Sequence, residues 1–298
     1  MAKIVECVPN ISEGRNQEII DQVVAEVRST PGVTLLDVSS DQSHNRTVIT
    51  FLGEPQGVED AAVKLAKKAV ELIDLNHHQG EHPRMGAVDV VPFIPVKDMT
   101  IEEAVALSKR AGQRIWEEAG LPVFLYEASA SAPHRVNLAA CRKGQFEGMP
   151  EKLLQEEWAP DYGERKIHPT GGIAAVGARL PLVAYNINLN TSDLSIASKI
   201  AKTIRESSGG LHYVKSIGVM LEDRNIAQVS INMTNLDKTP LYRVVELVRA
   251  EAQRWGVGIL GTEIVGLTPM NALIDSAAYY LQLEDFDRDH QVLENHLL

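Results

Sequence analysis

The feature that most constrains the fold is an order of hydrophobic patterns that occurs twice along the chain. In the first half, apolar periodicity predicts a strand, a helix, two strands joined by the polar loop D-Q-S-H-N, a second helix and a last strand. These segments are residues 4–8, 16–29, 33–40, 46–53, 58–73 and 88–96. Pro92 and Pro95 predict that the last strand is an edge strand or a bulged one. The first half is therefore expected to follow the order β-α-β-β-α-β.

The second half repeats this order. Strand patterns at 181–189, 214–221, 227–235 and 256–266 alternate with a helix pattern at 194–204 and a helix expected to be capped by Thr239, with Pro240 as its first residue. A final helix is expected over 271–281. The repeated order is that of the split β-α-β, or ferredoxin-like, unit. The sequence thus predicts an α+β protein of two tandem ferredoxin-like subdomains, 1–180 and 181–298, with helices on the outer faces and a ligand cleft between them.

A third region connects the two repeats. It contains a helix pattern over 101–118, with a capping box formed by Thr100 and Glu103, and a strand pattern over 122–129. The connecting segment at about 126–170 has little periodicity. Long structureless stretches inside compact proteins are usually functional. A surface linker is the alternative, although Trp158 and Tyr162 make it less favoured.

Composition narrows the class of protein. The net charge is −11 and no basic stripe is present, which argues against a nucleic-acid partner. No apolar run is long enough to span a bilayer, and the first ten residues lack a signal-peptide pattern, so a cytoplasmic protein without a membrane partner is expected. Cys7 and Cys141 are far apart and are interpreted as small buried hydrophobes.

One short motif suggests metal chemistry. Residues 78–82 read H-Q-G-E-H, which is the inverted zinc-protease pattern. That pattern requires a helix, whereas Gly80 and Pro83 disfavour one, so the stretch is expected to be a loop. We therefore interpret His77 and His78 as exposed loop histidines and keep a metal hydrolase as an alternative. His82 lies in a loop bounded by glycine and proline, a common setting for functional residues.

Six longer segments resemble the formiminotransferase family. They are V-E-C-V-P-N-I-S-E-G-R-N-Q-E-I-I, N-R-T-V-I-T-F-L-G, G-E-H-P-R-M-G-A-V-D-V-V-P-F-I-P-V, W-A-P-D-Y-G, G-A-R-L-P-L-V-A-Y-N-I-N-L and N-I-A-Q-V-S-I-N-M. The resemblance covers nearly the whole chain, and G-E-H-P-R-M-G-A is its most specific part.

The resemblance implies a reaction of histidine degradation. A formimino group passes from N-formimidoyl-L-glutamate to N5 of tetrahydrofolate, and L-glutamate is released. It further implies a homodimer, tetrahydrofolate as cosubstrate, no metal, and the histidine of G-E-H-P-R-M-G, here His82, as the general acid/base. The implied folate-binding residues are Gly163, Glu164, Arg165, Lys166, Ile167, His168, Pro169, Thr170, Gly171 and Gly172.

The chain also departs from its animal relatives. Those relatives carry a fused cyclodeaminase domain that 298 residues leave no room for, so a separate cyclodeaminase is expected, or the step is absent. Where the animal relatives have an acidic residue, this chain has Ser39, with Asp41 nearby. Whether Asp41 takes the role of that acid stays open.

Both implied substrates carry carboxylates, which arginine binds well. We predict that Asn10, Arg46 and Arg84 bind substrate and that Arg165 and Lys166 are available to the folate carboxylates. Asn188, like Asn10, either contacts the ligand or ends a strand. The remaining candidate cations are interpreted as surface charges: Arg135, Arg142 and Lys143.

Three alternatives remain at this point. The same site would suit transfer of a formyl group between 5-formyltetrahydrofolate and glutamate. A non-catalytic folate-binding or anion-binding module is a second possibility, and the metal hydrolase is the third.

Overall fold

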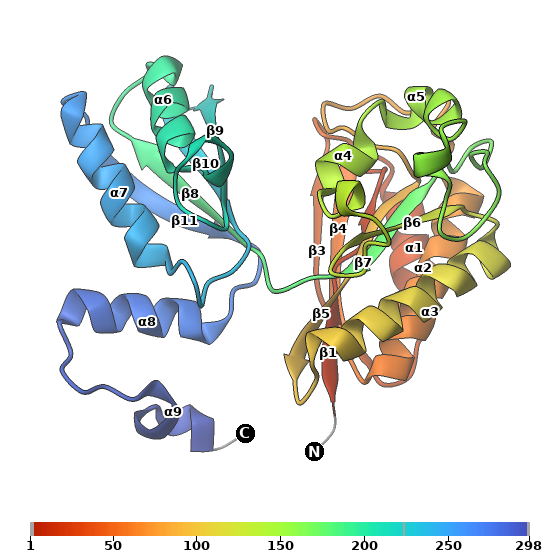
Figure 1. Cartoon of the computed structure of the whole chain (residues 1–298), viewed down its shortest axis with the longest axis horizontal. Helices are drawn as coiled ribbons and strands as arrows, with labels where there is room; N and C mark the ends of the chain where they lie inside the picture. Colours follow the sequence, from red (N-terminus) through yellow and green to blue (C-terminus); the bar gives the residue numbers. More distant parts are fainter. Residues whose placement is uncertain (1–2, 223, 297–298) are drawn as a thin grey trace. The chain divides into compact units, whose positions relative to one another are not determined.

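A computed structural model describes residues 3–222 and 224–296. The chain forms two compact units, of which the first ends at Arg179 and the second begins at Leu180. Each unit has its own β-sheet with helices packed against it, so the protein is of mixed α+β class (Figure 1). Within the described ranges, no helix is both long and apolar enough to cross a membrane.

The first unit is built on a seven-stranded sheet. Its strands are β1 (Ile4–Cys7), β2 (Asn10–Ile11), β3 (Val33–Asp41), β4 (Arg46–Gly53), β5 (Val88–Lys97), β6 (Val123–Glu127) and β7 (Ala174–Ala178). β1 and β2 occupy one position in the sheet, because both pair with β4 on one side and with β5 on the other. β3 pairs with the outer side of β4, while β7 and β6 extend the sheet beyond β5 in parallel orientation. The predicted order of the first six elements is confirmed, while β2 and β7 are strands that the sequence did not reveal.

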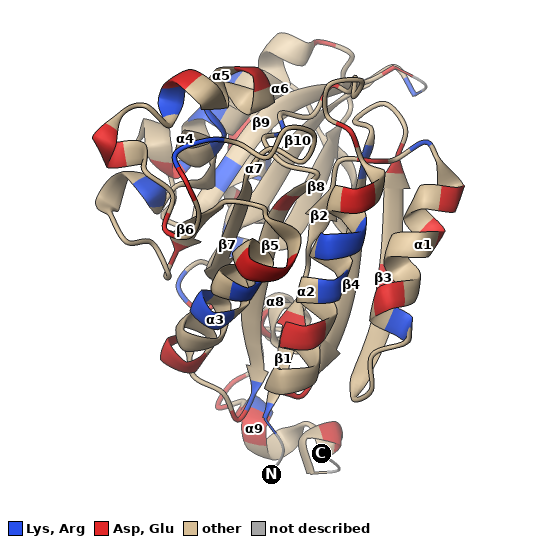
Figure 2. Cartoon of the chain, turned by 90° about the vertical axis from the view of Figure 1, so that its right-hand side faces the viewer, with Lys and Arg blue, Asp and Glu red and all other residues tan. Residues whose placement is uncertain are grey.

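Three helices cover one face of this sheet: α1 (Gln17–Arg28), α2 (Pro55–Leu72) and α3 (Ile101–Ala119). The Asn16 side chain caps α1, and the capping box of Thr100 and Glu103 at the start of α3 is confirmed. Their apolar sides pack against buried strand residues such as Phe51 and Phe93. Acidic and basic residues share the outer surfaces of these helices (Figure 2).

β5 lies inside the sheet, so the interpretation of this segment as an edge strand is wrong and the bulged alternative is right. Its pairing with β2 skips one residue, because Asn10 is opposite Val90 while Ile11 is opposite Val88. The skipped residue is Asp89. A bulge of this kind changes the direction of a side chain within a strand. It allows an aspartate in an otherwise apolar strand to serve the site described below.

The connecting segment is not structureless, which corrects the prediction for 126–170. It contains α4 (Leu138–Arg142), α5 (Gln145–Lys152) and the short 3-10 helices η1 (Pro133–Arg135) and η2 (Glu156–Trp158). These elements cover a second core that includes Phe124, Cys141 and Met149. Cys7 and Cys141 are both buried, as predicted, and burial raises the pKa of Cys141 to about 11.

The second unit contains β8 (Val183–Leu189), α6 (Leu194–Ile204), η3 (Glu206–Ser208), β9 (Val214–Leu221), β10 (Ile226–Met233), α7 (Leu241–Arg254), β11 (Ile259–Val265), α8 (Met270–Leu281), α9 (Arg288–Gln291) and η4 (Leu293–His296). Its antiparallel sheet has the order β11-β8-β10-β9. The predicted element order is confirmed. The predicted cap of α7 is wrong, because the Thr239 hydroxyl donates to the carbonyl of His212 instead and α7 begins after Pro240 without a side-chain cap.

Candidate functional site

A polar pocket in the first unit brings several predicted residues together. Its lining comes from four parts of the chain: Ser12, the β3–β4 turn, the loop before β5, and the bulge of β5. The lining residues are Ser12, His44, Asn45, Arg46, His78, His82, Arg84 and Asp89. Three predicted site residues, Arg46, His82 and Arg84, therefore lie at one place. Asn10, in β2, lies two residues before Ser12 and is buried. Within the described part of the chain, its side-chain oxygen has no hydrogen-bond partner.

The stretch with the zinc-protease pattern is not helical, so its interpretation as a loop is confirmed. Asn45, at φ +50°, holds this loop against the β3–β4 turn. Its amide donates to the carbonyl of Gln79 at 3.0 Å and accepts from the Gly14 amide at 2.9 Å. A Cβ on Gly80 would lie 2.3 Å from the carbonyl oxygen of His44, so the close approach requires glycine.

His78 is half-buried and fully engaged, which corrects its interpretation as an exposed loop residue; His77 is exposed as predicted. The Nε2 of His78 lies 2.8 Å from the carbonyl oxygen of Asn45, which can only accept. Nε2 is therefore the donor, and Nδ1 accepts from Arg84 Nε at 3.2 Å. His78 thus joins the β3–β4 turn to Arg84.

Arg84 already has partners within the protein. Two nitrogens of its guanidinium donate to the carboxylate of Glu147 at 2.8 and 2.6 Å. Its remaining contacts are His78 and, at 3.4 Å, Gln145. The side chain is only 10% exposed, and the ion pair lowers the pKa of Glu147. Arg84 therefore anchors α5 to the loop that carries His82.

Of the two arginines that line this pocket, Arg46 is the one that can still donate a hydrogen bond to a ligand. Its Nε is buried and has no hydrogen-bond partner among the residues that the structure describes. Burial and the neighbouring charge of Arg142 lower its pKa to about 10. Arg142, from α4, is itself paired with Asp89, which also accepts from the Met85 amide at 2.8 Å. Arg46, buried and with an unused donor, is therefore suited to bind an anionic ligand.

His82 is half-buried beside these cations. Burial, followed by the charges of Arg46 and Arg142 and by His44, lowers its pKa to about 3. The ring is therefore neutral at pH 7 and has a lone pair that can accept a proton. Its nearest ring neighbour is His44, with centroids 6.3 Å apart in an edge-to-face arrangement.

The predicted folate-binding segment lies beside the same loop. Gly171 and Gly172 are buried, and the carbonyl of Gly171 accepts from the amide of Ala87 at 2.8 Å. Gly172 has φ +70°, and a Cβ there would lie 2.1 Å from the carbonyl oxygen of Met85. The other end is exposed, with Lys166 paired to Glu164 at 2.7 Å.

The interpretations of the other polar candidates have mixed outcomes. Arg135 and Arg142 are not solvated surface charges, which corrects the prediction, whereas Lys143 is exposed as expected. Arg135 holds the segment before the folate loop by donating to Asp161 at 2.6 Å and to two backbone carbonyls. Asn188 is buried and accepts from Gln228 at 2.9 Å.

Sequence reasoning missed four lining residues: Ser12, His44, Asn45 and Asp89. An acid inside an apolar strand was an available signal for Asp89. The others carry no local signal, because their importance arises from contacts with distant parts of the chain.

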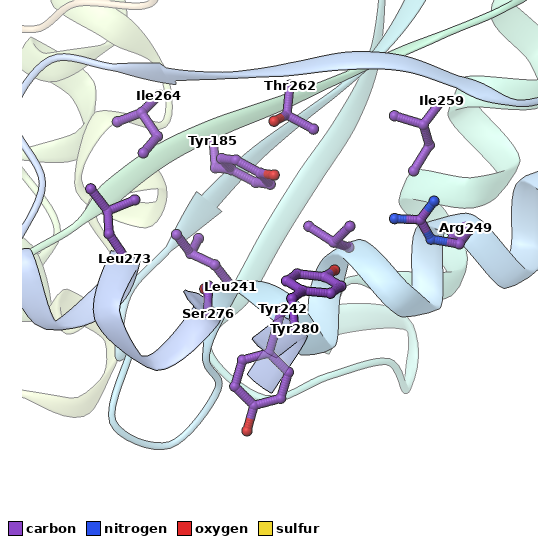
Figure 3. Close-up of a pocket in the computed structure, with 11 residues that line it drawn as sticks. Tyr185, Leu241, Tyr242, Arg249, Ile259, Thr262, Ile264, Leu273, Ser276 and Tyr280 are labelled. Atoms are coloured by element: carbon purple, nitrogen blue, oxygen red, sulfur yellow. The ribbon is translucent and has the colours of Figure 1, made fainter. Parts of the chain in front are cut away.

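A larger pocket of about 450 Å³ lies in the second unit between α7, α8 and β11 (Figure 3). Its walls are mainly aliphatic and tyrosine side chains, and Tyr280 and Arg249 both bond to Glu246, at 2.8 and 3.3 Å. No predicted site residue lines it. We therefore take the pocket around His82 as the candidate site.

The residues that the structure describes contain no group of three or more histidine, cysteine, aspartate or glutamate side chains placed to hold a metal ion.

Comparison with known proteins shows the family of the chain. The formiminotransferase domain, N-terminal subdomain, matches residues 4–179, and the formiminotransferase domain matches residues 184–295. A glutamate formimidoyltransferase from Streptococcus pyogenes serotype M1 is 62% identical over the full length of both chains. One from Thermoplasma acidophilum is 48% identical over 95% of this chain and 94% of its own. The formimidoyltransferase-cyclodeaminase of Mus musculus is 45% identical over 98% of this chain and 56% of its own. The chain belongs to the formiminotransferase family.

Proposed function

We propose that this protein transfers the formimino group of N-formimidoyl-L-glutamate to N5 of tetrahydrofolate and releases L-glutamate. Its family and its identity to two proteins named glutamate formimidoyltransferase support this activity. The observation within the site that carries the proposal is a neutral histidine, His82, beside a partly buried arginine whose Nε has no partner, Arg46. The first suits proton transfer and the second suits a carboxylate substrate.

Arg46 is the residue that we assign to a substrate carboxylate. Its Nε lacks a partner, whereas the donors of Arg84 are engaged by Glu147, His78 and Gln145. Arginine binds carboxylates in a planar, two-pronged manner. A carboxylate at Arg46 would place the rest of the substrate near His82, since both residues line one pocket. Arg84 then acts indirectly, by holding the loop of His82.

The chemistry needs one proton moved between two nitrogens. Attack of N5 on the formimino carbon forms a new C–N bond and leaves N5 positively charged. A base takes the N5 proton, and the glutamate nitrogen gains a proton as its bond to carbon breaks. The products are the N5-formimino folate and glutamate. We assign the removal of the N5 proton to His82, a role worth roughly 10²–10⁴-fold in rate.

Substrate binding would adjust His82 to this task. Burial and two neighbouring cations hold its pKa near 3, which makes it a weak base. A carboxylate bound at Arg46 cancels part of the positive charge. Because a nearby negative charge favours the protonated form of histidine, binding raises the pKa of His82 toward neutrality. The base thus becomes stronger when the substrate is present.

We further propose that residues 163–172 bind the folate. Their buried end is hydrogen-bonded to the strand start that follows the His82 loop, and their exposed end carries Arg165. Hydrogen exchange with and without a reduced folate tests this: protection is expected in residues 163–172 and 77–86. Protection confined to the exposed surfaces of α1 and α2 would contradict it.

The activity itself is tested by incubating purified protein with tetrahydrofolate and N-formimidoyl-L-glutamate and measuring released glutamate. Release that requires both substrates supports formimino transfer. A parallel reaction with 5-formyltetrahydrofolate and glutamate tests the formyl alternative. Binding of folate without turnover of either donor would favour a non-catalytic folate-binding module.

Five further expectations remain proposals. The strand order of each unit supports a ferredoxin-like plan, in which the first strand lies between the third and the fourth. A homodimer and a separate cyclodeaminase are expected from the family resemblance, and a cytoplasmic location is the expectation stated from the sequence pattern. The ligand cleft between the two subdomains stays a prediction.

A further inference from the structure

A second histidine lies beside His82 and has surroundings of the opposite charge. His44 is in the β3–β4 turn and lines the same pocket. Its backbone amide donates to one oxygen of Asp41 at 2.8 Å, and its Nδ1 lies 2.9 Å from the other. These contacts with His44 lower the pKa of Asp41. A carboxylate therefore holds the ring of His44, while Arg46 and Arg142 are the charges near His82.

The contact with Asp41 orients the ring. A carboxylate only accepts hydrogen bonds, so Nδ1 of His44 carries a proton. Nε2 is then the nitrogen available for exchange with a ligand. The ring is 47% exposed and lies edge-to-face with His82, with 6.3 Å between centroids. Two imidazoles in opposite electrostatic surroundings are the arrangement in which one serves as base and the other as acid.

We propose that His44, oriented by Asp41, gives a proton to the departing glutamate nitrogen while His82 takes the proton from N5. The inference rests on the proposed function. Protonated His44 loses its Nε2 proton to the glutamate nitrogen as the bond from that nitrogen to carbon breaks, and neutral His82 becomes protonated. After the products leave, one proton passes from His82 through water to His44. The sum is one proton moved from N5 to the leaving nitrogen.

Chemical rescue separates this role from a structural one. In His44→Ala, kcat should fall roughly 10²–10⁴-fold with both KM values within about twofold of wild type. Added imidazole should raise the kcat of His44→Ala at least tenfold, because the exposed position leaves room for it. Asp41→Asn keeps the ring but weakens its orientation, and should lower kcat about tenfold. Both variants keep the other charged and titratable groups of the pocket, which are Arg46, Arg84, Asp89, His78 and His82.

The chain supplies a matched control. His77 and Asp74 form the same three-residue-spaced pair, with Nδ1 and the carboxylate 3.2 Å apart, but His77 is 85% exposed and does not line the pocket. His77→Ala and Asp74→Asn should keep the wild-type rate. If His44→Ala keeps more than half of the wild-type kcat, or if its loss is not restored by imidazole, the inference is wrong. An inactive wild-type protein would instead overturn the proposed function.

Discussion

Replacing Arg46 with methionine should make the protein more stable and less active at the same time. The charge of Arg46 is partly buried, its Nε has no hydrogen-bond partner among the described residues, and its pKa is lowered to about 10. The pKa falls from 12.5 to about 10, and a pKa difference of one corresponds to about 1.4 kcal/mol, so folding disfavours the charged form by about 3 kcal/mol. Because Arg46 keeps some exposure, we discount this to about 2 kcal/mol for the gain expected in Arg46→Met.

The sign follows from the direction of the pKa change. The folded-state pKa of Arg46 is below its unfolded value, so the charge opposes folding at every pH below about 10, including pH 7. Removing the charge removes this opposition. For a unit of this size, about 2 kcal/mol corresponds to a rise in Tm of roughly 4–8 °C. The loss of a charge-assisted contact with the substrate should raise KM for N-formimidoyl-L-glutamate roughly 10–100-fold.

Thermal melting and steady-state kinetics measure the two effects. Added N-formimidoyl-L-glutamate should raise the Tm of the wild type but not of Arg46→Met. Arg15→Met is the control, because Arg15 is exposed and outside the pocket, with its Nε bonded to the carbonyl of Gln42; both measurements should stay near wild type. A lower Tm in Arg46→Met together with an unchanged KM would refute the reasoning.

Three further predictions concern the framework and the chemistry. Gly172→Ala should lower Tm and activity together, because a Cβ there would lie 2.1 Å from the carbonyl oxygen of Met85 and φ is positive. Gly148→Ala is the control and should be neutral, because a Cβ there meets open space. A Gly172→Ala protein with unchanged Tm and activity would disprove the close approach. Arg84→Met should cost about 1–2 kcal/mol in the free energy of unfolding, because it removes the hydrogen bond to half-buried His78 and the ion pair with Glu147, whose side chain is 64% exposed. Chemical denaturation measures this, and a stability equal to wild type would show that the pair is dispensable. Dialysis against a chelator should leave the transferase rate unchanged. If dialysis removes one zinc ion per chain and the activity is lost with it, the hydrolase alternative is favoured.

The regular part of the fold could be predicted because it follows local periodicity. The helices α1, α2 and α3 show apolar residues at helical spacing, and recognisable caps mark the starts of two of them: Asn16 for α1, and the pair Thr100 and Glu103 for α3. β7 escaped prediction because its five residues, A-A-V-G-A, are small, buried on both faces and do not alternate. The helices α4 and α5 were missed because α4 has five residues, Gly144 separates them, and Pro150 lies inside α5.

The candidate site was predicted only in part, for a physical reason. The G-E-H-P-R-M-G stretch located the loop of His82, since glycine and proline mark such loops in sequence. The pairing of side chains could not be read in the same way. Arg84 pairs with Glu147, 63 positions away, and Arg142 pairs with Asp89, 53 positions away. The tertiary fold alone therefore decides which arginine is paired within the protein and which can bind a ligand. For that reason Arg46 and Arg84 looked alike in the sequence but differ in the structure.

The central claim is that His82 accepts the N5 proton, and His82→Asn tests it most directly. Asparagine keeps a similar size and can hydrogen-bond, but it cannot take up the proton. We predict that kcat falls roughly 10²–10⁴-fold while tetrahydrofolate affinity and Tm change little. His77→Asn is the control; His78 is unsuitable because it holds Arg84. A His82→Asn protein that keeps most of the wild-type kcat, or that loses folate affinity and stability along with its rate, would contradict the assignment.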